Sequence, residues 1–122
     1  MTCRRSPTIS IRNVQRPEVA CRELARVLRP GGHLLFTVPF HFDNQENLRR
    51  ARGVGGAVEH LVEPCYHGNP MDPNGSLAYF DFGWELVRWV AEVGFREVSV
   101  LCYWSEALGH LGGGLEAFHA RR

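Results

Sequence analysis

The segment PEVACRELARVLRPGGHLLFTVP, residues 17–39, most constrains what this chain can fold into. In its first half, apolar residues recur at helical spacing, whereas its second half is a short and almost uninterrupted apolar run. The sequence Pro-Gly-Gly separates the two halves, because proline ends a helix and glycine permits a tight turn. The segment therefore predicts a helix over Pro17–Leu28, a turn, and a strand over Leu34–Val38.

The predicted strand Leu34–Val38 is apolar on both of its faces. Strands of this kind are normally buried between two layers of helices, and their backbone groups need neighbouring strands as partners. We therefore expect helices on both faces of the sheet that contains it. Ligands of open α/β sheets bind just beyond the carboxyl ends of the strands. This rule makes His41 a candidate residue of a substrate pocket.

Further elements follow from the pattern of the remaining residues, and together they predict an α/β fold. Leu86, Val87 and Val90 mark a helix over Gly83–Val93. A strand over Phe95–Trp104, a glycine-rich hairpin connection and a strand over Leu115–Ala120 complete the chain. The long connection, residues 40–82, predicts small elements of its own. These are a polar helix over Asn44–Arg52 with a solvated arginine face, and short strands over Val58–Val62 and Ser76–Phe82.

Composition and charge limit the partners and the compartment that the sequence predicts. The chain is 44% hydrophobic and 22% charged with a net charge of +1, so no nucleic-acid or membrane partner is predicted. No apolar run approaches the roughly 20 residues of a membrane span. Cys3, Cys21, Cys65 and Cys102 form no C-x-x-C pair and predict reduced thiols in a cytoplasmic protein. Residues 1–15 are expected to be a poorly ordered tail, and residues 16–122 to be the domain.

The phrase ELARVLRPGGHLLFTVPF, residues 23–40, resembles class I S-adenosylmethionine-dependent methyltransferases. It is similar to their fifth strand and the preceding helix, where L-x-P-G-G is a common signature. Further phrases are similar to a bacterial, methyltransferase type 11-like subgroup of that family. These are EHLVEPCYHGNP, GSLAYFDFGWELV, GFREVSV, WSEALGHLGG and FHARR. The resemblance covers about residues 16–122.

The resemblance implies a partial Rossmann-like, doubly wound sheet that holds strands five, six and seven of the family. Strand seven would be antiparallel and would lie between the other two. The implied cofactor is S-adenosylmethionine, and the implied acceptor is a small molecule or a glycan. Family members hold the cofactor through a glycine-rich turn in their first half. The glycines of GVGG, residues 53–56, follow no apolar strand, so no cofactor-binding residue is identified. The chain therefore resembles the C-terminal half of such an enzyme.

The resemblance also places the phrase Tyr66-His67-Gly68 over the substrate side of the pocket. His67 is the candidate general base, because an imidazole titrates near neutral pH, although a structural hydrogen-bonding role remains the alternative. Tyr66 and Trp104 are candidate pocket residues, while aromatic side chains at such spacings also occur in ordinary cores. His60, Cys65 and His67 lie close in sequence, but their spacing matches no usual zinc site, so no metal is predicted.

Two other classes of function remain open at the level of the sequence. The chain could be a non-catalytic α/β module that pairs through the open edge of the strand Leu34–Val38, with itself as a homodimer or with a partner. It could also be a small metal-binding protein that uses Cys65 and the neighbouring histidines.

Overall fold

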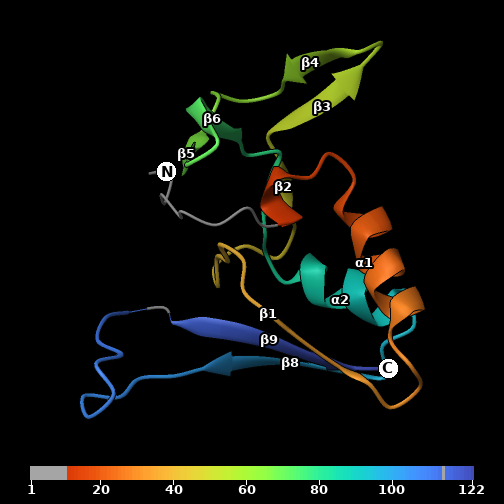
Figure 1. Cartoon of the computed structure of the whole chain (residues 1–122), viewed down its shortest axis with the longest axis vertical. Coiled ribbons are helices and arrows are strands. Elements are labelled where there is room, and N and C mark those ends of the chain that lie inside the picture. The colour runs from red at the N-terminus through yellow and green to blue at the C-terminus, as the bar shows by residue number, and fades with distance from the viewer. Residues whose placement is uncertain (1–10, 114) are drawn as a thin grey trace.

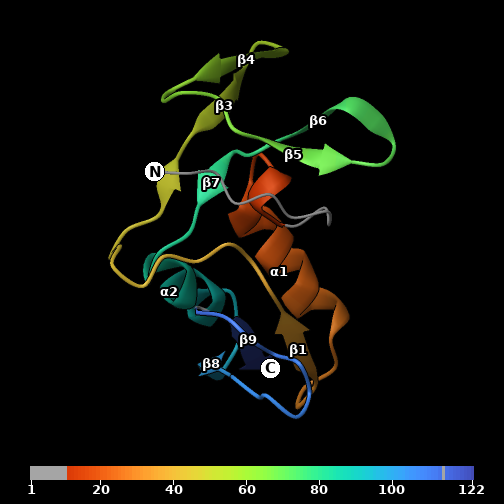
Figure 2. The same cartoon turned by 90° about the vertical axis from the view of Figure 1, so that its left-hand side faces the viewer.

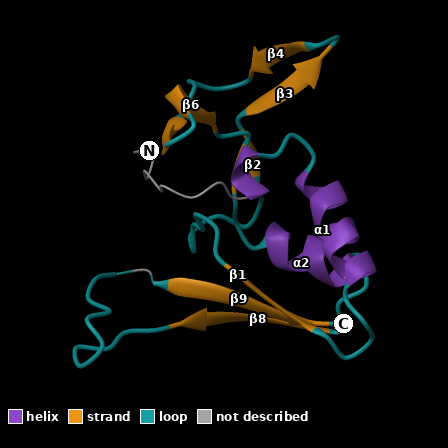
Figure 3. Ribbon diagram, viewed as in Figure 1, coloured by secondary structure: helices purple, strands orange, loops and turns teal. Residues whose placement is uncertain are grey.

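The computed structural model describes residues 11–113 and 115–122 as a mixed α/β structure of two α-helices and several small antiparallel sheets (Figure 1; Figure 3). The elements in chain order are the 3₁₀ helix η1 (Ile11–Asn13), α1 (Pro17–Val27), β1 (His33–Phe36), β2 (Leu48–Arg49), β3 (Ala51–Val54), β4 (Ala57–His60), β5 (Tyr66–Asn69), β6 (Asp72–Leu77), β7 (Phe80–Asp81), α2 (Glu85–Glu92), β8 (Glu97–Cys102) and β9 (Glu116–Arg121).

The largest sheet contains three strands in the order β1-β9-β8. Strand β9 is antiparallel to both neighbours, so β1 and β8 run parallel to each other on its two sides. Phe118 of β9 is in register with Phe36 of β1 and with Val100 of β8. The expected position of the last strand, antiparallel and between the other two, is confirmed. The sequence also predicted both helices and all three strands within a few residues of their bounds.

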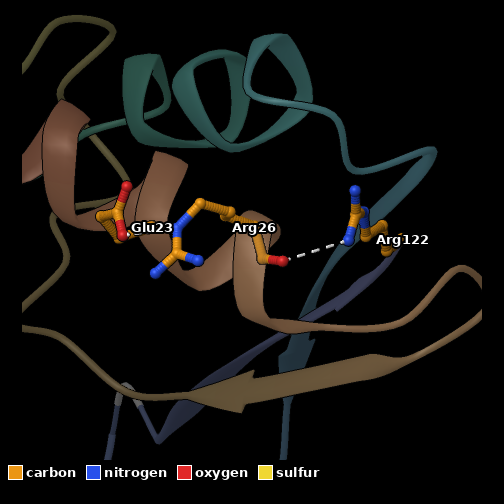
Figure 4. Close-up of polar contacts among 3 residues, drawn as sticks. All are labelled: Glu23, Arg26 and Arg122. Atoms are coloured by element: carbon orange, nitrogen blue, oxygen red, sulfur yellow. Dashed lines mark hydrogen bonds and ion pairs between the residues drawn. The ribbon is translucent and has the colours of Figure 1, made fainter.

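Helix α1 forms where the sequence predicted it. Pro17 occupies the first turn, where its missing N–H costs nothing, and the helix presents Cys21 and Ala25 to the core. Gly31, with a φ of 80°, turns the chain into β1. The end of α1 is held by Arg122, whose Nη1 lies 3.4 Å from the carbonyl oxygen of Arg26 and also bonds to the carbonyl of Leu28 (Figure 4). A cation at this position complements the negative end of the helix dipole.

Both helices pack on the same face of the three-stranded sheet (Figure 2). Leu86 and Val90 of α2 and Phe118 of β9 have no exposed surface, and Cys21 of α1 is 2% exposed. The buried cluster continues beyond the helices into the connection through Phe80 and its neighbours. One apolar core therefore joins the sheet, the helices and part of the connection.

The opposite face of this sheet is uncovered within the described part of the chain. Leu35 of β1 is 69% exposed and Leu101 of β8 is 47% exposed. Among residues 11–113 and 115–122, α1 and α2 lie on one side of the sheet, so the expectation that helices cover both faces of β1 is not met there. His33 and His119 also lie on the open face, with 2.8 Å between Nδ1 of the first and Nε2 of the second.

The connection between β1 and α2 forms three two-stranded antiparallel pieces, β2 with β7, β3 with β4, and β5 with β6. The β3–β4 and β5–β6 hairpins extend away from the helices and the main sheet (Figure 1). Gly55 and Gly56 form the two-residue turn between β3 and β4, with φ values of 57° and 83°. This backbone geometry fits a type I′ hairpin turn. Gly55 and Gly56 of GVGG thus form a hairpin turn, and Gly53 lies within β3.

The helix expected over Asn44–Arg52 is absent, and strands β2 and β3 occupy part of that range. Nη1 of Arg50 lies 2.6 Å from Oδ2 of Asp81, and the side chains are 12% and 2% exposed. The second guanidinium nitrogen of Arg50 donates to the carbonyl of Glu63 at 2.8 Å. A buried charge is tolerated only with such partners. The expected solvated arginine face is therefore wrong at Arg50, because long-range pairing overrides the local helical pattern.

The residues just before α1 contact the connection. Nδ2 of Asn13 donates to the carbonyl of Leu77 at 2.9 Å, and Nε2 of Gln15 donates to the hydroxyl of Tyr79 at 3.2 Å. These contacts anchor residues 13 and 15, which the sequence assigned to the expected tail. The rest of that prediction, residues 1–10, lies outside the described residues.

The cysteines differ from one another in chemical state. Cys65 is disulfide-bonded, so the prediction of reduced thiols is wrong at this position. A disulfide depends on which residues the fold brings together, and spacing in the sequence does not reveal that. Cys21 and Cys102 are free. Burial, with a smaller contribution from Glu18, raises the pKa of the Cys21 thiol to about 11. Neither described helix has the length and apolarity to cross a membrane.

Candidate functional site

A groove lies where β1 and β8 end and β9 begins. Its volume is about 370 Å³, and we call it the aromatic groove. Its lining residues are Phe42, Cys102, Tyr103, Trp104, Gly112 and Leu115. Because β1 and β8 are parallel, their carboxyl ends meet at the same edge of the sheet. Ligands of open α/β sheets bind at this position.

The residues of the aromatic groove come from three segments that the sheet brings together. Phe42 follows β1 by six residues, Tyr103 and Trp104 follow β8 directly, and Leu115 directly precedes β9. The backbone N–H of Tyr103 donates to the carbonyl of Leu115 at 3.0 Å, which extends the pairing of β8 with β9 into the groove. The groove therefore exists only when all three strands are assembled.

Two of the four predicted site residues lie at or beside the aromatic groove. Trp104 is one of its walls and is 63% exposed. His41 precedes the lining residue Phe42, and its backbone N–H donates to the carbonyl of Phe82 at 2.9 Å. His41 itself is half-buried and is not a lining residue.

Tyr66 and His67 lie elsewhere, on strand β5 of the connection. Tyr66 is 49% exposed, whereas His67 is only 3% exposed and is in register with Ser76 of β6. Neither lines the aromatic groove. A general base must reach the proton that it abstracts, and His67 has almost no surface through which a substrate could approach. Its catalytic role and the pocket role of Tyr66 stay predictions.

The metal-binding alternative meets a chemical obstacle at Cys65, because a cysteine ligates zinc only as a free thiolate and Cys65 is in a disulfide. Among residues 11–113 and 115–122, no group of three or more histidine, cysteine or acidic side chains is arranged to hold a metal ion.

Sequence reasoning missed Cys102, Tyr103 and Leu115 as groove residues. A signal for them was present, since each lies at the end of a predicted strand on the edge where ligands bind. The sequence does not show how far β8 extends before the chain leaves the sheet, so Tyr103 was read as part of the strand Phe95–Trp104.

Comparisons with known proteins identify no relative of this chain. No family model matches the chain, and no curated protein and no solved structure shows significant similarity to it.

Proposed function

We propose that this chain forms the C-terminal half of a class I S-adenosylmethionine-dependent methyltransferase. In this proposal the sheet β1-β9-β8 corresponds to strands five, seven and six of a doubly wound, Rossmann-like sheet. The complete enzyme would transfer a methyl group to a small-molecule or glycan-type acceptor. S-adenosylmethionine would be held mainly by residues that this chain does not contain.

The strand order carries the proposal. An antiparallel last strand lies between two parallel strands, and the first of these follows the helix and the Leu-Arg-Pro-Gly-Gly turn that resemble the family. Sequential strands usually lie beside each other, so a last strand inserted between two earlier ones is an uncommon arrangement. It is also the arrangement that the resemblance implies.

Two further features support an incomplete sheet. Strand β1 pairs only with β9, so its other edge has no partner strand within the described residues. Leu35 exposes 69% of its surface on the face that lacks helices. A strand with a free edge and an exposed apolar side chain fits the inner position that strand five would have in a larger sheet.

The proposal is tested by the coding sequence upstream of this chain and by the binding of S-adenosylmethionine. Genomic DNA upstream of Met1, translated in all three frames, is expected to encode a strand, a G-x-G-x-G turn and a helix. The longer polypeptide should then release heat on titration with S-adenosylmethionine, whereas this chain alone should not at millimolar cofactor. Absence of such coding sequence, together with no cofactor binding by this chain, would reject the proposal.

A second candidate is a non-catalytic module that pairs through the free edge of β1, and the exposure of Leu35 favours it. In this case the chain would form a homodimer whose mass depends on concentration in light scattering. Leu35→Lys should shift the dimer to monomer, because a charge on an edge strand opposes pairing. Leu108→Lys is the matched control, since Leu108 is 75% exposed and lies outside β1. A monomer at all concentrations excludes this candidate.

The compartment is also part of the proposal. The absence of paired cysteine motifs in the sequence favours the cytoplasm, whereas the disulfide at Cys65 argues against it, because structural disulfides are rare in reducing compartments. Alkylation of the freshly lysed source cells, followed by mass spectrometry of the peptide that contains Cys65, would decide between the two.

A further inference from the structure

The aromatic groove is lined by uncharged residues. None of its six lining residues is acidic or basic, and three of them carry aromatic rings. Phe42 is 38% exposed, Tyr103 is 42% exposed and Trp104 is 63% exposed. Burial of such rings against a ligand would remove apolar surface from water without any cost of desolvating a charge.

The first wall of the groove is held in place before any ligand arrives. The indole N–H of Trp84 donates to the carbonyl of Phe42 at 2.9 Å. The ring of Phe42 also meets the ring of Phe40 edge to face, with 5.0 Å between centroids, and Phe40 meets Trp84 in the same way at 5.1 Å. Phe40 is buried, so this chain of contacts ties the wall to the core.

The opposite wall is closed by the loop between β8 and β9. The backbone groups of Ser105 and His110 exchange two hydrogen bonds of 3.0 and 2.8 Å. The ring of His110 meets the ring of Tyr103 edge to face, with centroids 5.3 Å apart. These contacts hold the loop beside Tyr103 and Trp104, which lowers the ordering entropy that this wall would lose on binding.

We propose that the aromatic groove binds an uncharged, planar aromatic small molecule by stacking against Trp104. The volume of about 370 Å³ falls within the range of small-molecule sites. The absence of acidic and basic lining residues selects against charged ligands, and the exposed rings select for a flat partner. This inference concerns binding alone and does not depend on the proposed methyl transfer.

The test uses the full chain, 2-naphthol as the uncharged planar probe and 2-naphthoate as its anionic counterpart. Titration of 2-naphthol, followed by NMR, should shift the indole N–H of Trp104 and saturate within the millimolar range. The carboxylate analogue should bind about tenfold more weakly, because it must be desolvated without a charged partner. Equal binding of the two probes would overturn the proposal.

Variants distinguish specific binding in the groove from non-specific binding to exposed apolar surface. Trp104→Ala should weaken 2-naphthol binding about tenfold, because it removes the stacking ring. Leu108→Ala is the matched control, an exposed apolar residue of the same loop that does not line the groove, and it should leave binding unchanged. Circular dichroism confirms that each variant is folded. Unchanged affinity in Trp104→Ala, or equal losses in both variants, would contradict the inference.

Other occupants of the groove would give different results. If a second copy of the chain fills it, sedimentation will show a dimer that Trp104→Ala dissociates, and 2-naphthol will compete with dimer formation. If the N-terminal half of a longer protein covers it, the longer polypeptide will lose the response of Trp104 to 2-naphthol. Either result would replace the small-molecule ligand with a polypeptide.

Discussion

The three-stranded sheet with its two helices and the long connection, residues 40–82, are stabilised in different ways. In the sheet, apolar side chains of α2 and β9 are fully buried against each other. In the connection, strand β4 exposes all of its side chains, whereas the buried part combines apolar residues of the shared core, such as Phe80 and Phe82, with the ion pair between Arg50 and Asp81. The comparison shows that local patterning specifies the first region, whereas the second depends on long-range contacts, both apolar and polar, that local patterning does not predict.

The largest effect on stability is expected at Phe118, in the centre of the sheet. Its ring is fully buried and lies 5.1 Å from the rings of both Phe36 and Phe40. Phe118→Ala should lower the free energy of unfolding by about 3–5 kcal/mol, because it leaves a cavity in the core. Urea denaturation measures this loss. Met71→Ala in the connection, at a residue 89% exposed, should change stability by less than about 0.5 kcal/mol.

The next largest effect is expected at Asp81, and it should be confined mainly to the connection. Asp81→Asn removes the charge that faces Arg50 and should cost about 3 kcal/mol, since a buried guanidinium then lacks its counter-ion. Hydrogen exchange should show faster opening of β2 and β7 than of β8 and β9. Glu59→Gln, which breaks the exposed pair of Arg52 with Glu59, is the control and should have a far smaller effect. Uniform loss of protection would mean that the two regions unfold as one.

A smaller effect is expected where the two regions meet, at Gly83. A Cβ at this position would lie 2.3 Å from the carbonyl oxygen of Asn44 and 2.6 Å from that of Glu46. Gly83→Ala should therefore force the backbone apart and cost about 1–3 kcal/mol. Gly68→Ala is the matched control within the connection, because no atom lies within 4 Å of a Cβ built there. Equal stability of the two variants in thermal denaturation would contradict the close approach at Gly83.

The smallest effect on stability concerns Cys21, on the buried face of α1, and appears only at high pH. Its folded-state pKa of about 11 lies above the ordinary value of 9.0, because burial and then Glu18 disfavour the thiolate. The unfolded chain therefore releases its proton at lower pH than the folded chain does. The free energy of unfolding should fall as pH rises from about 9 towards 11. Urea titrations across this range should show a smaller fall of the free energy of unfolding in Cys21→Ala than in the unchanged chain. Equal falls would mean that the Cys21 thiol is exposed to solvent in the folded state.

The accuracy of the sequence predictions follows the same division. The helix Pro17–Leu28 and the strand Phe95–Trp104 were close to α1 and β8, because their apolar periodicity matches the face that they bury. The helix expected over Asn44–Arg52 failed, because no apolar face there demands a helix and Arg50 finds Asp81 instead. At the site, Trp104 was a predicted pocket residue and lines the groove, whereas Tyr103 and Leu115 were missed although both lie at the ends of predicted strands.

The sequence by itself determined the two amphipathic helices, the three long strands and the turns between them, since each depends on residues close together in the chain. Only the tertiary structure decided that both helices lie on one face, that Arg50 is buried against Asp81, that Cys65 is oxidised, and that the aromatic groove exists. The physical reason is that these features join residues distant in sequence. Their energies depend on geometry and desolvation, and the local sequence pattern specifies neither.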